Sequence, residues 1–254
     1  MIWKQDEKFR IFIYLRVFHL LMEGITVVTA VLNEGDNIGP FMRSLDSVNG
    51  VKELVVVDDG STDSTIQNIR DLHPHYEVKI IQRGRKMGTV SAQIAGAKEA
   101  SCEFVVIMDA DLQHDPSLIE TMHSEIMKGY DLVIASRMVN GGASRRPPVR
   151  GIISRGANFL AHIFIPQTKG VNDIMSGFFL TRKDLVSGLV QINDSYKLLL
   201  YVFASRKGIR YIEVPYNFLP RTGGESKVVS GFDFLLRYII ELMYYVKVEF
   251  NTEG

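Results

Sequence analysis

Several features that would assign the chain to a common protein class are missing from its sequence. Cys102 is the only cysteine among 254 residues, so a disulfide framework and a cysteine-rich metal site are both excluded. A chain so poor in cysteine suits a reducing compartment. The 29 lysines and arginines equal the 29 aspartates and glutamates in number, so the net charge gives no electrostatic reason to expect nucleic-acid binding.

The chain also lacks a long hydrophobic run. No apolar stretch reaches the roughly 20 residues that a membrane-spanning helix needs. Asp6, Glu7, Arg10 and Arg16 interrupt the first 23 residues, so we interpret 1–23 as an amphipathic extension and not as a secretory signal. We therefore expect the protein to fold in the cytoplasm and to contact a membrane, if at all, peripherally on its cytoplasmic face.

Segments typical of strands alternate with segments typical of helices through the first half of the chain. Apolar, β-branched runs predict the strands, and apolar residues at helical spacing predict the helices between them. The expected strands are 25–31, 53–57, 78–81, 104–108 and 131–136, and the expected helices are 37–49, 63–72, 89–100 and 117–128. This order predicts an α/β fold, an open, mostly parallel, doubly wound sheet with flanking helices.

The second half of the chain is less regular. A loop rich in glycine and proline, 141–148, precedes it. Beyond this loop we expect helices at 152–165, 196–206 and 232–250, a turn that runs into a strand over 172–180, and a strand at 209–214.

Charged residues gather where the predicted strands end. Ligands of open α/β sheets bind beyond the carboxyl ends of the strands, so side chains in such positions are candidates for one common site. These residues are Glu34, Asp58, Asp59, Asp109, Asp111 and Arg137.

Two carboxylates one residue apart, Asp109 and Asp111, follow the apolar run 104–108 directly. Mg²⁺ and Mn²⁺ prefer carboxylate, carbonyl and water oxygens, and they often bind substrate phosphates as well. The pattern therefore favours a metal-dependent enzyme with a phosphorylated substrate. The alternative is a surface turn with an acid at a helix N-terminus, and for Asp115, which precedes Pro116, we adopt that interpretation.

The chain resembles a known family in three segments of its first half: Leu-Asn-Glu at 32–34, Val-Asp-Asp-Gly-Ser-Thr-Asp at 57–63, and Asp-Ala-Asp-Leu-Gln-His-Asp-Pro at 109–116. These segments resemble the nucleotide-sugar half of the inverting glycosyltransferases of family 2, which have a GT-A fold. Later segments, 153–160, 172–178 and 221–227, are similar to the polyprenyl-phosphate branch of that family, the dolichyl-phosphate mannose synthases. We therefore expect a GT-A domain over 24–228, followed by a C-terminal apolar helix at 229–254.

The resemblance implies an activity. It implies inverting transfer of mannose from GDP-mannose to dolichyl or another polyprenyl phosphate, with Mg²⁺ or Mn²⁺ as the metal. No residue distinguishes guanine from uracil, so transfer of glucose from UDP-glucose to a polyprenyl phosphate is an alternative. A family 2 enzyme with a soluble or protein acceptor and a non-catalytic nucleotide-sugar sensor are wider alternatives.

The resemblance also implies roles for individual residues. The implied metal ligands are Asp109, Asp111 and Gln113. The implied donor-binding residues are Leu32, Glu34, Asp58, Asp109, Ala110, Arg221 and Lys227. The implied ligands of the acceptor phosphate are Arg137, Arg150, Arg155 and Ser226. The implied catalytic residues are Asp111, Asp173 and Arg137.

Several of these assignments have simpler alternatives. Glu34 could be a solvated acid at the start of a helix, where negative charge is favourable. Asp59 could assist Asp58 or cap the following turn. Asp173 could act as a base, orient the sugar hydroxyls or cap a turn, and each arginine could be an ordinary surface cation. The chain also departs from the family pattern at Ala30, where relatives usually have proline, and at Tyr201, where they often have an acid.

A polyprenyl acceptor would bring the enzyme to a membrane surface. Arg237, Glu241 and Lys247 make the helix 232–250 too polar to span a bilayer, while its aromatic residues suit the headgroup level. We expect this helix to contact the membrane surface or a small membrane-anchoring partner. Residues 9–22 are a second candidate, and packing on the core of the domain is the alternative for both segments.

Overall fold

The computed structural model describes residues 24–144, 148–190, 197–219 and 232–252. The expected N-terminal extension at 1–23 lies outside these ranges.

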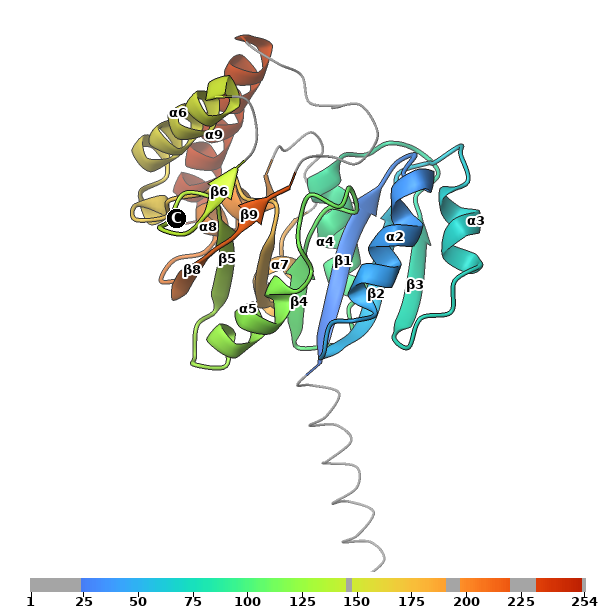
Figure 1. Ribbon diagram of the computed structural model, residues 1–254. Helices are drawn as coiled ribbons and strands as arrows, with labels where there is room; N and C mark the ends of the chain where they lie inside the picture. Colours follow the sequence, from blue (N-terminus) through green and yellow to red (C-terminus); the bar gives the residue numbers. More distant parts are fainter. Residues whose placement is uncertain (1–23, 145–147, 191–196, 220–231, 253–254) are drawn as a thin grey trace, which may run out of the picture.

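A seven-stranded sheet forms the centre of the molecule (Figure 1). Its strands are β1 (Ile25–Val31), β2 (Val51–Asp58), β3 (Glu77–Gln82), β4 (Phe104–Ile107), β5 (Leu132–Ser136), β7 (Phe179–Arg182) and β8 (Tyr211–Pro215). They are arranged in the order β3-β2-β1-β4-β7-β5-β8, and of these seven β7 alone runs antiparallel to its neighbours. The prediction of an open, mostly parallel sheet is confirmed.

Helices cover both faces of the sheet, as the doubly wound prediction requires. The helices on one face are α2 (Gly35–Leu45), α3 (Thr65–Arg70) and α5 (Leu118–Ile126). Those on the other face are α4 (Thr89–Glu99), α6 (Pro148–Phe164), α7 (Lys183–Ser187), α8 (Leu198–Ser205) and α9 (Phe232–Thr252). A short 3₁₀ helix, η1 (Pro166–Thr168), follows α6, and β6 (Ala143–Ser144) pairs with β9 (Asn217–Phe218) in a small separate sheet.

Successive strand residues alternate between two hydrophobic cores. In β2, Val55 and Val57 contribute to the core beneath α4, while Leu54 and Val56 contribute to the core beneath α2. A strand buried on both faces needs apolar residues at nearly every position. This is why the strands of the first half are visible in the sequence as unbroken apolar runs.

The reversed strand β7 has a consequence for the site. The parallel strands β1, β2, β4 and β5 end along one border of the sheet, which we call the strand-end edge. The chain leaves β5 at this edge, forms α6, and returns through residues 172–178 before it enters β7 in the opposite direction. Asp173 is thereby brought beside Arg137, whose backbone N–H donates to it at 3.0 Å. The sequence predicted a strand here, but not its direction.

Helix α9 shares the core of the domain. Its Tyr238 hydroxyl donates to the carbonyl of Ala157 in α6 at 3.1 Å, and its Tyr245 stacks on Tyr201 of α8 with ring centroids 5.2 Å apart. Tyr201 occupies the position at which the family pattern often has an acid, and here it is a buried packing residue. Among the helices that the structure describes, none is both long enough and apolar enough to cross a membrane.

Candidate active site

The loops after β1 and β2 are tied to each other by hydrogen bonds. Asn33 donates from its backbone N to Ser61 Oγ at 2.9 Å, and its Oδ1 accepts from the backbone N of Thr62 at 2.8 Å. The φ of Asn33 is +54°, in the left-handed region that asparagine tolerates better than most residues. The backbone N of Gly35 donates to Asp63 at 2.9 Å. These bonds hold the two loops together at the strand-end edge.

The predicted donor-binding residues of the first half lie along this edge. Asp58, the last residue of β2, is buried and accepts a hydrogen bond from the backbone N of Ser61 at 3.0 Å. Glu34 is half-buried before α2 and accepts from Asn37 Nδ2 at 2.8 Å. Leu32 is half-buried directly after β1. The position of Glu34 also suits the alternative of an acid at a helix N-terminus.

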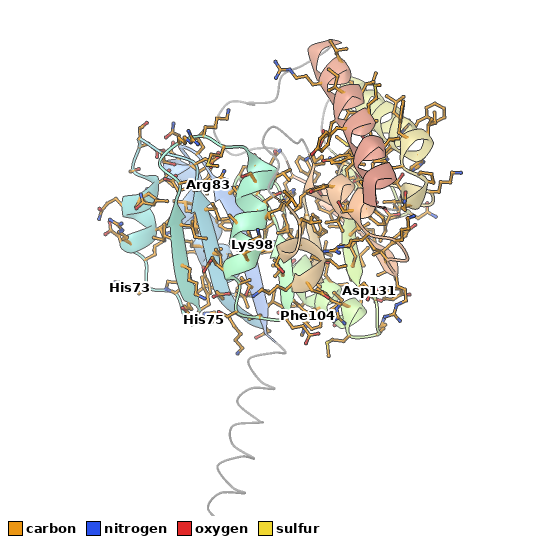
Figure 2. The ribbon with its side chains drawn as sticks, turned by 180° about the vertical axis from the view of Figure 1, so that it is seen from behind. His73, His75, Arg83, Lys98, Phe104 and Asp131 are labelled. Carbon is orange, nitrogen blue, oxygen red and sulfur yellow. The ribbon has the colours of Figure 1, made fainter. Side chains whose placement is uncertain are left out.

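Asp59 has a partner that the sequence did not suggest. The Nε of Arg83 donates to its Oδ1 at 2.6 Å, and Nη2 pairs with the same oxygen. Its Oδ2 accepts from the backbone N–H groups of Met87 and Gly88 at 3.2 and 3.0 Å. Both charged side chains are 8% exposed, and Figure 2 shows Arg83 near the strand-end edge. Asp59 therefore anchors the segment that leads into α4, and the turn after β2 is capped by Asp58 instead.

The predicted metal ligands lie in a turn directly after β4. Leu112 has a φ of +61°, which reverses the chain, and Asp111 Oδ1 accepts from the backbone N of Gln113 at 3.2 Å. The Nε2 of Gln113 donates to the carbonyl of Leu219 at 2.9 Å, so the turn is fastened to the segment after β9. Asp109 is half-buried, and Asp111 and Ala110 are buried. We call residues 109–113 the acidic turn.

A cluster of four aromatic rings adjoins the acidic turn. We call His114, Phe178, Tyr216 and Phe218 the aromatic cluster. His114 stacks on Phe178 with ring centroids 5.1 Å apart, and its Nδ1 accepts from the backbone N of Asp109 at 3.2 Å. The guanidinium carbon of Arg137 lies 5.6 Å from the centre of the Phe218 ring. The cluster thus links the acidic turn to Arg137.

Gly177 leaves space beside the acidic turn. A Cβ atom at this position would lie 3.5 Å from Asp109 Oδ2, 3.6 Å from Lys197 Nζ and 3.7 Å from His114 Cε1. The missing side chain therefore keeps clear the region between an acid and a cation. Sequence reasoning did not select Lys197, because it stands outside the recognisable motifs, directly before a mostly apolar helix.

The donor set of the acidic turn fits a hard divalent cation. Asp109 supplies a carboxylate beside the space at Gly177, and Asp111 supplies a second one two residues further along the same turn. Within the described ranges, no group of three or more histidine, cysteine, aspartate or glutamate residues could hold a metal ion. A metal at the acidic turn would therefore need further oxygen ligands, and Mg²⁺ commonly obtains these from water and from substrate phosphates.

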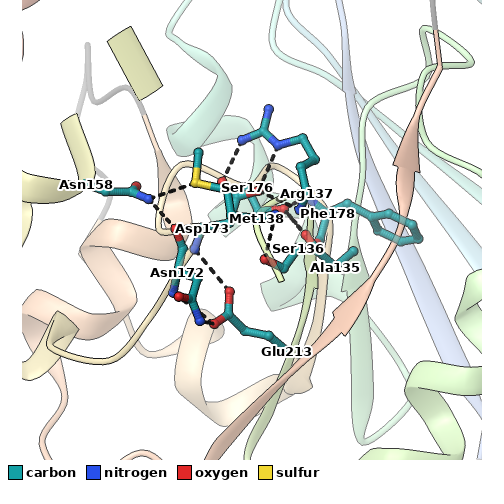
Figure 3. Close-up of polar contacts among 10 residues, drawn as sticks. All are labelled: Ala135, Ser136, Arg137, Met138, Asn158, Asn172, Asp173, Ser176, Phe178 and Glu213. Atoms are coloured by element: carbon teal, nitrogen blue, oxygen red, sulfur yellow. Dashed lines mark hydrogen bonds and ion pairs between the residues drawn. The ribbon is translucent and has the colours of Figure 1, made fainter. Parts of the chain in front are cut away.

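Arg137 and Asp173 form a buried ion pair directly after β5 (Figure 3). Arg137 donates from Nε to Asp173 Oδ2 at 2.7 Å and from Nη2 to Oδ1 at 2.6 Å. The Arg137 side chain is 8% exposed and that of Asp173 has no exposed surface. Burial works against the charge of the guanidinium, but the hydrogen bonds and charge of Asp173 outweigh it and raise the pKa of Arg137 above its ordinary value. Arg137 is therefore cationic at any physiological pH.

The other predicted phosphate-binding residues are only partly placed by the structure. Arg155 is exposed on α6. Arg150 belongs to the same helix, and its side chain lies outside the described part of the chain. Arg221, Ser226 and Lys227 fall within 220–231, which is also outside it. The structure places the predicted residues of the first half, along with Arg137 and Asp173, along the strand-end edge.

Comparison with known proteins assigns the family. Residues 26–190 match the family described as glycosyl transferase family 2. The chain belongs to glycosyltransferase family 2. It is 38% identical over 224 residues to a dolichol-phosphate mannosyltransferase of Pyrococcus furiosus, a match that covers 86% of this chain and 63% of that protein. Proteins with the same name from Mycosarcoma maydis (30% identity; 89% of this chain, 80% of that protein) and Saccharomyces cerevisiae (33%; 75% and 73%) are also similar.

Solved structures support the fold of this glycosyltransferase. Glucosyl-3-phosphoglycerate synthase from Mycobacterium tuberculosis, solved in complex with Mn²⁺, UDP and glucosyl-3-phosphoglycerate, superposes with a TM-score of 0.66 at 20% identity, covering 89% of this chain and 81% of that one. At this level of identity the match concerns the fold alone. The expected GT-A architecture is confirmed, and the chain spans less than two thirds of the length of the Pyrococcus relative.

Because Asp59 and Arg83 form a buried ion pair, we expect a substitution of Asp59 to lower the stability of the fold strongly. Asp59→Asn leaves the buried Arg83 guanidinium without its charged partner, and breaking a buried pair in this way costs about 3–5 kcal/mol. We expect that loss in the free energy of unfolding measured by urea denaturation. The matched control is Asp184→Asn, because the pair of Asp184 and Arg182 is 3.4 Å long and largely exposed, and we expect a change below about 1 kcal/mol there. Equal losses in the two variants would contradict the anchoring role.

Proposed function

We propose that this family 2 glycosyltransferase transfers mannose from GDP-mannose to dolichyl or another polyprenyl phosphate, with Mg²⁺ or Mn²⁺. The single observation that carries the proposal is the arrangement at the strand-end edge. Two carboxylates follow β4, a buried arginine follows β5, and the aromatic cluster connects them. A site that joins a diphosphate to a second anion needs a place for a metal and a separate place for a fixed cation. The names of the three relatives support the same reaction.

The donor would bind on the acidic side of the site. Asp109, Asp111 and Gln113 would hold the metal, which when bound supplies positive charge that offsets the charge developing on the leaving diphosphate. Asp58 would accept hydrogen bonds from the base or ribose. The same region would be lined by Glu34, Leu32 and Ala110. We also propose that Arg221 and Lys227 bind the donor.

The acceptor would bind on the basic side. A phosphate monoester has a second pKa near 6, so its oxygen is already ionised at neutral pH and needs little help from a base. In an inverting reaction this oxygen forms a bond to C1 of the sugar from one side, while the bond from C1 to the diphosphate oxygen breaks on the other and GDP leaves with the electron pair. The first requirement is then a cation that draws two anions together, and Arg137 would meet it with Arg150 and Arg155. Ser226 would donate a hydrogen bond to the same phosphate.

The transfer reaction itself tests this proposal. Purified protein with labelled GDP-mannose, Mn²⁺ or Mg²⁺ and a polyprenyl phosphate is expected to form a charged glycolipid, with UDP-glucose as the competing donor. Asp111→Asn should lower the rate at least about 10²-fold, because it removes one metal-binding charge. Asp115→Asn is the matched control, since Asp115 is an exposed acid that caps the backbone N of Ser117 in the same loop. Glycolipid formed from UDP-glucose alone would reassign the donor, and full activity of Asp111→Asn would contradict the metal assignment.

We also propose that helices α6 and α9 place the enzyme on a bilayer surface. They lie side by side and extend beyond the strand-end edge (Figure 1). In α9, Tyr238, Leu242 and Tyr245 are buried against the domain. The opposite side of α9 and the outer side of α6 expose large apolar residues between 48% and 65% exposed, namely Leu236, Ile240, Met243, Tyr244, Phe159 and Ile163. Arg155 and Arg237 are exposed on the same helices, which suits anionic headgroups.

Vesicle binding tests this membrane surface. The double substitution Ile240→Glu with Met243→Glu should weaken binding to vesicles that contain phosphatidylglycerol by roughly 10-fold or more, because it replaces apolar surface with charge. Co-sedimentation measures the change. The matched control is Met127→Glu, which alters a residue 54% exposed directly after α5. If the control variant lost as much vesicle binding as the double variant, α9 would not be the contact surface.

A further inference from the structure

Both carboxylate oxygens of Asp173 accept hydrogen bonds from Arg137. Its Oδ2 accepts from the backbone N and from Nε of Arg137, and its Oδ1 accepts from Nη2. The side chain has no exposed surface. A general base must come within hydrogen-bonding distance of the proton that it removes. Arg137 engages both oxygens of this fully buried carboxylate, so the geometry does not suit a proton acceptor.

Arg137, in contrast, keeps one side of its guanidinium available. Nε and Nη2 face Asp173, whereas Nη1 makes no hydrogen bond with any residue that the structure describes, and Figure 3 shows it pointing away from Asp173. The Phe218 ring, 5.6 Å from the guanidinium carbon, packs against the group as well. A planar guanidinium held along one edge presents its remaining N–H donors in a fixed direction, which favours an anionic ligand.

Glu213 of β8 holds the Asp173 segment in place. Its Oε1 accepts from the backbone N of Asp173 at 3.0 Å, and its Oε2 accepts from the backbone N and Nδ2 of Asn172 at 2.8 and 2.6 Å. From α6, Nδ2 of Asn158 donates to the carbonyl of Asn172. Strand β8 and helix α6 therefore both hold the segment of Asn172 and Asp173 in place, and Asp173 in turn orients Arg137.

We propose that Asp173 is a positioning residue and not a base, and that Asp173 and Glu213 together aim Arg137 at the phosphate of the acceptor. The inference rests on the proposed function, because it takes the acceptor to be a phosphate monoester. For such an ionised nucleophile, a cation of fixed orientation is the requirement, and a proton acceptor is not. The bonds of Asp173 to the backbone and side chain of Arg137 meet that requirement.

Steady-state kinetics with Asp173→Asn, Arg137→Lys and the double variant test the proposal. The substrates are GDP-mannose and farnesyl phosphate in detergent micelles, used with the full chain. Asp173→Asn should raise the KM for farnesyl phosphate roughly 10- to 100-fold, the loss expected for charge-assisted hydrogen bonds, with the KM for GDP-mannose within about twofold. The shape of the pH profile should not change. The double variant should be little worse than the more damaged single variant, because the two residues act as a unit.

A base at Asp173 would give a different result. Asp173→Asn would then lower kcat with the acceptor KM unchanged, it would remove the acidic limb of the pH profile, and its effect would multiply with that of Arg137→Lys. Any of these outcomes overturns the positioning role. Circular dichroism establishes that Asp173→Asn is folded, and if it is not, Arg137→Lys and Glu213→Gln carry the same test.

Glu213→Gln and a matched control complete the experiment. Glu213→Gln should raise the acceptor KM in the same direction but by a smaller factor, because Asp173 keeps its bonds to Arg137. Asp131→Asn disrupts the exposed pair of Asp131 and Arg210, which joins the opposite ends of the same strands, β5 and β8. Figure 2 shows Asp131 at the far end of the sheet, and its substitution should leave both KM values unchanged. An unchanged acceptor KM in Glu213→Gln would remove Glu213 from the proposal.

Equilibrium binding separates this inference from the reaction on which it rests. Calorimetry with farnesyl phosphate needs no turnover. Absence of product from the wild type, with binding that Asp173→Asn weakens, would overturn the proposed reaction and leave the positioning role intact. Equal binding by the wild type and Asp173→Asn, or no binding by either, would overturn the positioning role whether or not product forms.

Discussion

The candidate site holds two opposite charges apart at one edge of a sheet. If Asp109 and Arg137 could meet, they would neutralise each other and neither would serve a charged substrate. The aromatic cluster separates them: His114 accepts a hydrogen bond from the backbone N of Asp109, Phe218 packs against Arg137, and the ring centroids of His114 and Phe218 are 5.6 Å apart. The cluster therefore lies between the acidic turn and the cation and is in contact with both.

Two buried arginines that the structure describes at this edge are each paired with a carboxylate. Arg83 is paired with Asp59, and Arg137 is paired with Asp173. Leaving a buried charge unpaired costs several kcal/mol, so these aspartates serve the fold first. The two pairs differ in what remains exposed to a ligand. Arg83 donates from Nη1 to Ser91 as well, whereas Nη1 of Arg137 makes no such bond within the described ranges. This difference separates a structural arginine from one that can bind substrate.

The sequence predicted the parts of the fold that are encoded locally. Strands buried on both faces are continuous apolar runs, so β1, β2, β4 and β5 were found, and the strand-end rule placed Asp58, Asp109, Asp111 and Arg137 at one edge. It could not predict contacts between distant segments. Nothing local links Asp59 to Arg83, or Asp173 to Arg137 and Glu213, because these bonds exist only once β3, β5, β7 and β8 are in place. Lys197 and Gly177 meet beside Asp109 for the same reason.

The most direct test of the account is a crystal structure of the GDP-mannose complex with Mn²⁺, with the ion located by its anomalous scattering. We expect an ion bonded to a carboxylate oxygen of Asp111 and to the diphosphate, with Nη1 of Arg137 on the opposite side of the mannose C1 atom. An ion bound away from the acidic turn, or Arg137 bound to the diphosphate on the same side as the ion, would contradict it.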